Sequence, residues 1–333
     1  MSNPETGDQA RGDHIPGGNP DDKDFVYDEM SYFSENCEEY GLSWDGTAVV
    51  ERVDVELPGG RIASALKWGE GSPELVLLHG GAQNAHTWDT VALALRPTAT
   101  LAIDLGGHGR SGWREDGAYS PEANADDAAA LIDRFAPDAR VLAGMSLGGL
   151  TATALAAKYP WLVQRLVVLD VTPGVNRDKA ADVHAFIEGP QTFPSFTEIF
   201  DRTMEFNPTR SPESLRRGIL HNAHRSASGE WEWNYDRTLA SSGEALDAGT
   251  DDPTAEAAAG WTSDLWQDVE DVRSPYLLLR GSLSPVVDDE DVAELKRRQP
   301  EARVIVVDGA GHSIQGDRPL ELAEILRAEL AAG

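Results

Sequence analysis

The chain has 333 residues and a formal net charge of −29, with 57 acidic side chains against 28 basic ones. Nucleic acids and anionic membrane surfaces bind basic protein faces, so this balance argues against both as partners. Cys37 is the only cysteine, which excludes a disulfide within the chain and is typical of a reducing compartment. These features predict a cytoplasmic protein without a nucleic-acid partner and without insertion into a membrane.

Residues 1–24 are polar, rich in Gly, Pro and Asp, and without the basic and apolar regions of a secretory signal. They hold too few apolar groups to offset the entropy of ordering, so we expect a disordered acidic tail. The apolar side chains that follow are spaced as on one face of a helix: Val26, Met30, Phe33, Cys37 and Tyr40. Gly41 is a typical helix end. The pattern predicts a helical arm over residues 25–48, with Cys37 on its buried face.

From residue 49 onward, short apolar segments alternate with helical ones. Residues 49–57 and 61–69 flank a Pro-Gly-Gly turn, which predicts a β-hairpin. Six further predicted strands lie within residues 74–81, 98–107, 141–146, 166–173, 275–281 and 302–309. Helical segments accompany them at residues 86–96, 124–136, 150–159, 289–298 and 320–330. Strands that are apolar on both faces and joined by helices indicate an α/β fold, with a mostly parallel eight-stranded sheet flanked by helices.

The alternation stops at Gly174 and resumes at about residue 269. The segment 174–268 contains helix-like pieces without a strong strand. It is rich in aromatic residues, namely Phe186, Phe193, Phe196, Phe200, Phe206, Trp231, Trp233, Tyr235, Trp261 and Trp266. The simplest interpretation is a helical insertion between two strands of one sheet, so that residues 49–173 and 269–333 form the core.

Gly144-Met145-Ser146-Leu147-Gly148 follows a predicted buried strand and precedes a helix of small residues. This context fits the G-x-S-x-G elbow, in which a tight turn presents a serine hydroxyl at the carboxyl edge of a sheet, beside a helix N-terminus. Side chains at the two glycines would collide with their neighbours in such a turn. Ser146 is therefore the candidate nucleophile, against the alternative of a Gly/Ser turn that only packs a helix closely on a strand.

A serine nucleophile needs a base and donors for the oxyanion. His312, in a glycine-bordered loop after the last predicted strand, is the candidate base, against the alternative of an ordinary loop histidine. The backbone N–H groups of Gly81 and Leu147 are the candidate oxyanion donors. Other positions in these loops are expected to be structural: His79, Gly80, Asp104 and His108.

Four motifs occur in one order along the chain: HGG at 79–81, D-x-x-G-x-G-x-S at 104–111, GMSLG at 144–148 and GAGH at 309–312. In this order the chain resembles the α/β-hydrolase fold superfamily, and the likeness covers about residues 49–333. The resemblance implies a cap domain in the insertion 174–268, a hydrophobic acyl pocket beneath the cap, and no cofactor.

The chain departs from the family pattern at the triad acid. Most relatives carry a carboxylate three residues past the glycine of the strand at 275–281, where this chain has Ser284. Asp170 follows the preceding strand, which in this fold lies between the serine and histidine strands. The chain is similar here to a subset of bacterial esterases whose acid follows that strand, with an auxiliary serine at the usual place. The resemblance thus predicts Asp170 as the acid and Ser284 as auxiliary. Asp288 or Asp289, which also fit a helix N-cap, and a degraded triad are the alternatives.

These residues and the resemblance predict a serine hydrolase for small to medium uncharged esters, thioesters or lactones. The same triad allows carbon–carbon bond hydrolysis of a ring-cleavage diketone, or perhydrolysis. A serine in place of an aspartate nucleophile argues against a dehalogenase or an epoxide hydrolase. A non-hydrolytic ligand-binding scaffold is the alternative from another class, motivated by the missing carboxylate at position 284. The acidic charge disfavours anionic substrates unless a local Arg overrides it.

Neither a metal site nor a phosphate site is predicted. His221 and His224 have helical i, i+3 spacing, but the nearby sequence offers no third ligand, so a solvated helix is favoured. The glycine clusters do not form a phosphate-binding loop. The sequence carries no signal for the oligomeric state.

Overall fold

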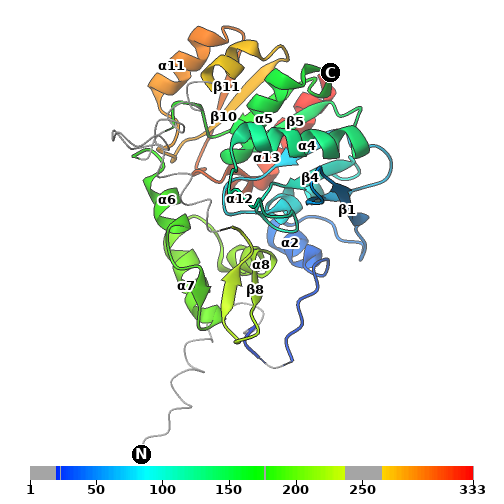
Figure 1. Cartoon of the computed structure of the whole chain (residues 1–333), viewed down its shortest axis with the longest axis vertical. Helices are drawn as coiled ribbons and strands as arrows, with labels where there is room; N and C mark the ends of the chain where they lie inside the picture. Colours follow the sequence, from blue (N-terminus) through cyan, green and yellow to red (C-terminus); the bar gives the residue numbers. More distant parts are fainter. Residues whose placement is uncertain (1–19, 23, 176–177, 237–264, 333) are drawn as a thin grey trace, which may run out of the picture.

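The computed structural model describes residues 20–22, 24–175, 178–236 and 265–332 of the chain (Figure 1). Nearly all of the predicted disordered tail lies outside the described residues, and so does Trp261. The described residues form one eight-stranded sheet in the order β1-β2-β4-β3-β5-β6-β10-β11. The predicted fold class is therefore confirmed.

The strands of this sheet fall where the apolar segments predict them. They are β1 (Val50–Glu56), β2 (Ile62–Trp68), β3 (Leu75–Leu78), β4 (Thr100–Asp104), β5 (Val141–Met145), β6 (Leu166–Leu169), β10 (Tyr276–Gly281) and β11 (Arg303–Val307). β2 runs antiparallel to β1 and β4, and the other neighbours are parallel. β3, β4, β5 and β6 are buried along their whole length, which explains why their sequences are continuously apolar.

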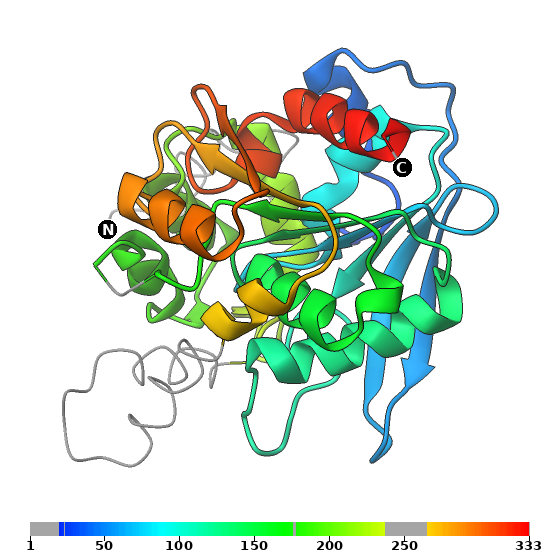
Figure 2. The ribbon, with the colours of Figure 1, turned by 90° about the horizontal axis from the view of Figure 1, so that it is seen from above.

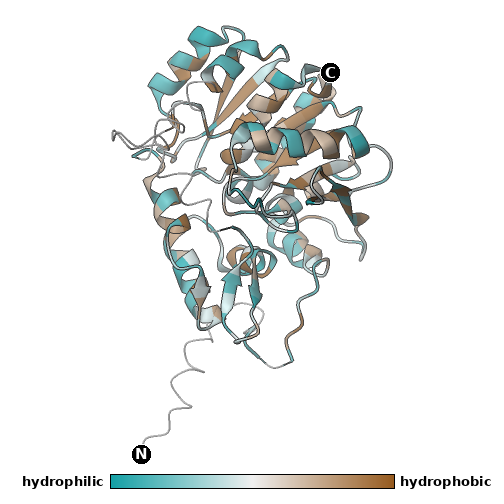
Figure 3. Ribbon diagram, viewed as in Figure 1, coloured by the Kyte–Doolittle hydropathy of each residue, from teal (hydrophilic) through white to brown (hydrophobic). Residues whose placement is uncertain are grey.

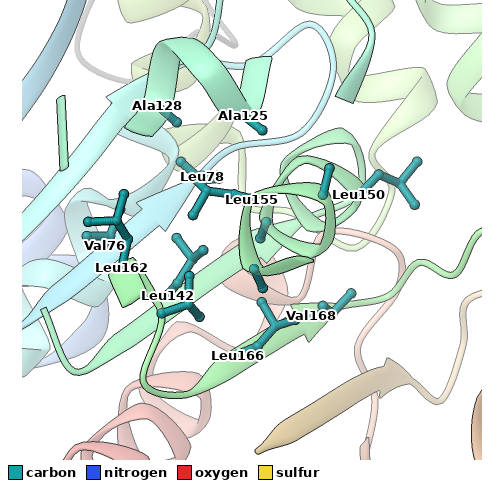
Figure 4. Packing of buried hydrophobic residues seen from close by; sticks show 14 of the residues in the cluster. Val76, Leu78, Ala125, Ala128, Leu142, Leu150, Leu155, Leu162, Leu166 and Val168 are labelled. Carbon is teal, nitrogen blue, oxygen red and sulfur yellow. The ribbon is translucent and has the colours of Figure 1, made fainter. Parts of the chain in front are cut away.

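Helices cover both faces of the sheet (Figure 2). One face is packed by α4 (Pro121–Phe135), α5 (Leu147–Lys158) and α11 (Asp289–Arg298), and the other by α2 (Phe33–Tyr40), α3 (Asp89–Leu95) and α13 (Pro319–Ala331). Figure 4 shows the first interface, where Leu78, Leu142 and Val168 of the strands meet Leu150 and Leu155 of α5. In Figure 3 the hydrophobic strands of the sheet are brown, and the helices outside them are largely teal, which marks hydrophilic residues. Among the described residues, no helix combines the length and the apolar character needed to cross a membrane.

The N-terminal helix is shorter than the sequence pattern predicts. Cys37 is buried as expected and Gly41 ends the helix with φ +64°, but α2 begins only at Phe33. Val26, predicted on the buried face, is 81% exposed. The preceding residues instead form a turn, in which the Ser31 N–H donates to the carbonyl of Asp28, and the prediction of helix over this part was wrong.

In the insertion between β6 and β10, residues 265–271 are helical, and the described part before them forms three helices and three short strands. They are α6 (Ala181–Ile187), β7 (Thr192–Phe193), α7 (Phe196–Phe206), α8 (Pro212–Asn222), β8 (Ala223–Arg225) and β9 (Trp231–Trp233). The sequence indicates helix-like pieces without a strong strand here, and the structure adds these three short strands, which pair antiparallel in the order β7-β9-β8. Strands of two or three residues are too short to show an alternating pattern in sequence. Buried aromatic side chains join them to α7, among them Phe196, Phe200, Trp231 and Trp233.

Candidate active site

Ser146 lies in a sharp turn between β5 and α5. Its backbone is strained, with φ +52° and ψ −121°, a region that side-chain-bearing residues rarely adopt. The flanking glycines are required by close backbone contacts. A Cβ at Gly144 would lie 2.1 Å from the carbonyl oxygen of Gly148, and one at Gly148 would lie 2.4 Å from that of Leu78. The turn thus holds the hydroxyl at the carboxyl edge of the sheet, as the G-x-S-x-G pattern predicts.

His312 follows β11 and meets a buried carboxylate that follows β6. Its Nδ1 lies 2.8 Å from Oδ2 of Asp170, whose side chain is fully buried. The Gly281 N–H donates to Oδ1 of Asp170 over 2.9 Å, and the Ser284 hydroxyl donates to Oδ2. Because an ionised carboxylate only accepts hydrogen bonds, Nδ1 of His312 is the donor and Nε2 is left free to act as a base.

The other two candidate acids lie elsewhere. Asp288 caps α11 by accepting the N–H of Asp291 over 2.9 Å, and its carboxylate pairs with Lys179, also at 2.9 Å. The Lys179 ammonium and the backbone hydrogen bond lower the pKa of Asp288 to about 2. Asp289 pairs with Arg280 at 2.6 Å. Of the three aspartates considered from sequence, Asp170 is the one within hydrogen-bond distance of His312.

Ser146 and His312 line one cavity of about 290 Å³. Within the described part of the chain the Ser146 hydroxyl makes no hydrogen bond, so its contact with Nε2 of His312 stays a prediction. Apolar side chains of α6, among them Val183, Phe186 and Ile187, form part of the wall. The cavity therefore combines a hydroxyl, an imidazole and an apolar surface contributed by the insertion.

Two backbone amides beside Ser146 are free to hold an oxyanion. Leu147 is the first residue of α5, so its N–H has no partner within the helix. Gly81 lines the cavity, and its neighbour Gly80 is so close to Ser146 that a Cβ there would lie 3.3 Å from the Ser146 Cβ. Among the described residues, neither the Gly81 N–H nor the Leu147 N–H donates to another group, which fits a pair of donors aimed at a ligand.

Two buried histidines hold the loop that carries Gly81. His79 hydrogen-bonds the carbonyl of Gly80 through Nδ1 and accepts the N–H of Leu105 at Nε2 over 2.9 Å. His108 accepts the N–H of Ala82 at Nε2 over 3.1 Å. Burial lowers the pKa of both, that of His108 to about 3, so both imidazoles stay neutral near pH 7. Their roles are positional.

Asp104 also holds the loop that carries Gly81, through hydrogen bonds to backbone N–H groups. Its carboxylate accepts the N–H groups of Ala85 at 2.6 Å and Arg110 at 3.0 Å, and it pairs with the Arg52 guanidinium at 2.7 Å. Burial raises the pKa of Asp104, but Arg52 and these hydrogen bonds outweigh it and hold the pKa below its ordinary value. The carboxylate is therefore charged and occupied with structure, as the sequence indicates.

His221 and His224 do not share a site. His224 is exposed and lies 2.7 Å from the Asn234 amide oxygen. His221 is buried and stacks on His86, with ring centroids 3.8 Å apart and planes inclined by 8°. The expectation of a solvated helix face was thus wrong for His221, because α8 packs against the 3₁₀ turn η1 (Ala85–Trp88) of the core.

No sequence pattern predicts the charged cluster that His86 forms with Glu29 and Asp89. Its ring nitrogens lie 2.9 Å from Asp89 and 3.1 Å from Glu29. One donor atom each from His86, Asp89 and His221 lie within 4.8 Å of one another. The two imidazoles are stacked nearly parallel, so their nitrogens do not converge on a common centre as those of metal ligands do. We assign this cluster to hydrogen bonding between a histidine and two carboxylates.

This cluster makes folding stability depend on pH. Burial lowers the pKa of His86, but the Asp89 and Glu29 carboxylates outweigh it and raise the pKa to about 9. A folded-state pKa above the unfolded value of about 6.5 gives stability that is complete below that value and lost as pH rises toward 9. We expect the free energy of unfolding in urea to fall across this range, and to fall less in His86→Gln. An equal fall in both proteins would contradict this assignment.

The chain belongs to the alpha/beta hydrolase family, since a sequence model of that family matches residues 75–325. Among the curated proteins it is similar to the esterase Rv0045c of Mycobacterium tuberculosis, with 42% identity over 317 residues that cover 93% of this chain and 98% of that protein. A solved structure of that esterase has a TM-score of 0.77 and 41% identity, covering 92% of this chain and 99% of the other.

A more distant relative is the 2-(acetamidomethylene)succinate hydrolase of Mesorhizobium japonicum. It is 29% identical over 273 residues, which cover 81% of this chain and 91% of that protein. A solved structure of an E-2-(acetamidomethylene)succinate hydrolase has a TM-score of 0.71 and 25% identity to this chain. The match covers 86% of this chain and 100% of the other. Proteins that match most of this chain thus include both an esterase and a hydrolase of 2-(acetamidomethylene)succinate.

Proposed function

We propose that this ester hydrolase cleaves small to medium carboxylic esters, thioesters or lactones by acyl transfer through Ser146. The 42% identity to an esterase over most of both chains supports ester bonds as the target. The observation that carries the mechanism is the hydrogen bond from His312 to the buried Asp170, at the cavity that also contains Ser146.

In this mechanism the Ser146 oxygen attacks the carbonyl carbon while Nε2 of His312 accepts the hydroxyl proton. The N–H groups of Gly81 and Leu147 stabilise the oxyanion, and His312 then gives its proton to the departing alcohol. Water, deprotonated by the same nitrogen, attacks the acyl-enzyme and releases the acid. Asp170 keeps its charge throughout, so it holds the imidazole in the required tautomer and stabilises the imidazolium.

Ser284 takes part through Asp170. The Ser284 hydroxyl and His312 both donate to Oδ2, while Gly281 donates to Oδ1. A fully buried carboxylate needs such partners, because burial without hydrogen bonds favours its neutral form. Ser284 is thus a positioning residue that supplies a hydrogen bond to the buried carboxylate and orients it.

The insertion 174–268 acts, in this proposal, as a cap over the cavity of the core formed by 49–173 and 269–333. Support comes from α6, whose Val183, Phe186 and Ile187 line the cavity opposite the loop of Gly81. A Cβ at Gly81 would lie 3.6 Å from the Ile187 Cδ1, so α6 of the insertion lies close to the loop of the oxyanion donor. The cap then excludes water and selects the acyl chain.

The non-hydrolytic alternative rests on the missing carboxylate at position 284, which Asp170 supplies in this proposal. A fluorophosphonate probe and a panel of p-nitrophenyl esters test the choice. We expect the probe to label the wild type and not Ser146→Ala, and the wild type alone to hydrolyse the esters. A wild type that is folded, unlabelled and inactive on the whole panel would favour a binding scaffold instead.

A further inference from the structure

A second cavity adjoins the one that contains Ser146 and His312. It measures about 150 Å³ and shares four wall residues with the first, Ala82, Gln83, Phe186 and Asn207. The largest share of its remaining wall comes from α8, with further residues from α2, α3, α7, β9 and η1 and from α12 (Ile314–Asp317). Polar side chains outnumber apolar ones among its lining residues, and they include Asn84, Thr87, Thr90 and Arg210. We call it the polar chamber.

Arg210 is the unusual member of the polar chamber. Its Nη2 donates to the Ser214 hydroxyl over 2.5 Å, while its Nε is buried without a hydrogen-bond partner. Among the described residues, no carboxylate oxygen lies within 4.0 Å of this guanidinium. Burial lowers the pKa of Arg210, because desolvation outweighs the attraction of Tyr40, Asp317 and Glu39. A guanidinium has five N–H donors, so most of its capacity is unused.

The other charges of the polar chamber are matched by partners. His86 lies between the carboxylates of Asp89 and Glu29, and Arg217 forms an ion pair with Glu39. Asp317, which lines the first cavity, accepts the Gly311 N–H at 2.8 Å and the Thr209 hydroxyl at 2.9 Å. Arg210 is thus the cation whose counter-charge is missing, and an uncompensated, partly buried charge is costly.

The wall shared by the two cavities is held by neutral polar contacts. Gln83, in the shared wall, accepts a hydrogen bond from the Gln315 amide over 3.3 Å, and Gln315 also donates to Thr87 in the polar chamber. These long, neutral contacts are exchangeable, so a ligand can replace them without stranding a charge. The planar guanidinium offers paired donors that match a carboxylate.

We infer that the polar chamber binds a carboxylate of the substrate, remote from the scissile ester, with Arg210 as its anchor. The inference rests on the proposed function and narrows it to half-esters and other carboxylate-bearing esters. It departs from the uncharged substrate that the net charge of −29 favours. The attraction between a guanidinium and a carboxylate in direct contact outweighs the repulsion by the protein's net negative charge, because salt screens that repulsion over about 8 Å.

The test compares p-nitrophenyl monoesters of dicarboxylic acids, from succinate to suberate, with neutral p-nitrophenyl esters of the same chain length. At the best length we expect kcat/KM to favour the charged ester by about tenfold or more. Arg210→Gln should remove this preference and leave the neutral ester nearly unchanged, and Arg210→Lys should keep part of it. Arg225→Gln, which changes an exposed arginine of the same insertion, should behave as wild type.

The inference fails separately from the proposed function. Turnover of neutral esters without any preference for the charged ones, or an equal loss on both in Arg210→Gln, overturns the carboxylate site and leaves the esterase intact. If no ester is hydrolysed, the inference is tested by the binding of a free dicarboxylate. Glutarate or suberate should then raise the melting temperature of the wild type, to a lesser extent that of Arg210→Lys, and not that of Arg210→Gln. No shift in the wild type overturns the inference.

Discussion

Replacing Asp170 by Asn is expected to lower kcat for a p-nitrophenyl ester about 10⁴-fold with little change in melting temperature. Asn has the same shape, and its oxygen still accepts the Gly281 N–H, while its amide nitrogen takes the place of Oδ2 and faces the Ser284 oxygen as a donor. Its neutral amide can donate to Nδ1 of His312, which favours the tautomer whose Nε2 carries the proton. The base is then blocked, and the imidazolium loses its counter-charge. Steady-state kinetics and thermal unfolding on the same preparation measure both quantities.

Asp288→Asn is the matched control, because Asp288 also follows a strand of the sheet but caps α11 and pairs with Lys179. Asn is itself a good N-cap residue, so both kcat and melting temperature should stay close to wild type. A collapse of kcat in Asp288→Asn with an active Asp170→Asn would reverse the assignment of the acid. If kcat stays high in both variants, neither Asp170 nor Asp288 is the triad acid.

The sheet and two of the site residues could be predicted because their signals are local. Continuous apolar runs marked the core strands, and the spacing of glycines marked the turns of Ser146 and His312. Asp170 needed the strand order of the fold, since nothing in its own neighbourhood sets it apart. The contacts of His86 with Glu29 and of Arg210 with Ser214 depend on how the arm, the insertion and the core pack together. No periodicity in the sequence encodes that packing.

The backbone strain at Ala82 and Asp170 could not be predicted from the sequence, whereas the tight turn at Ser146 follows from the G-x-S-x-G pattern. Three residues other than glycine have positive φ among the described residues, Ala82 at +57°, Ser146 at +52° and Asp170 at +51°. Each directly follows, or is itself, a residue proposed for the reaction: Ala82 comes after Gly81. Strained conformations cost free energy and persist where the surroundings enforce them. All three lie in the loops that carry Gly81, Ser146 and Asp170, which supports the proposal that these loops are shaped for catalysis.

Gly148→Ala is expected to destabilise the protein by about 3 kcal/mol or more, or to prevent folding. The added Cβ would lie 2.4 Å from the carbonyl oxygen of Leu78 and 2.5 Å from that of His79, both at the end of β3. Neither backbone group can move without breaking the pairing of β3 with β4 and β5. Moving them would also displace Gly81. Urea unfolding measures the free energy, and residual ester turnover at low temperature shows whether the oxyanion donors have shifted.

Gly218→Ala supplies the control, because Gly218 lies inside α8 and a Cβ there would meet nothing within 4 Å. Alanine is the better helix former by about 1 kcal/mol, so this change should stabilise the protein slightly. If the free energy of unfolding falls in Gly148→Ala and rises in Gly218→Ala, close contact with β3 is what requires a glycine at position 148. Equal effects would mean that the close packing of α5 on β3 adapts, and the steric account of the motif would then be wrong.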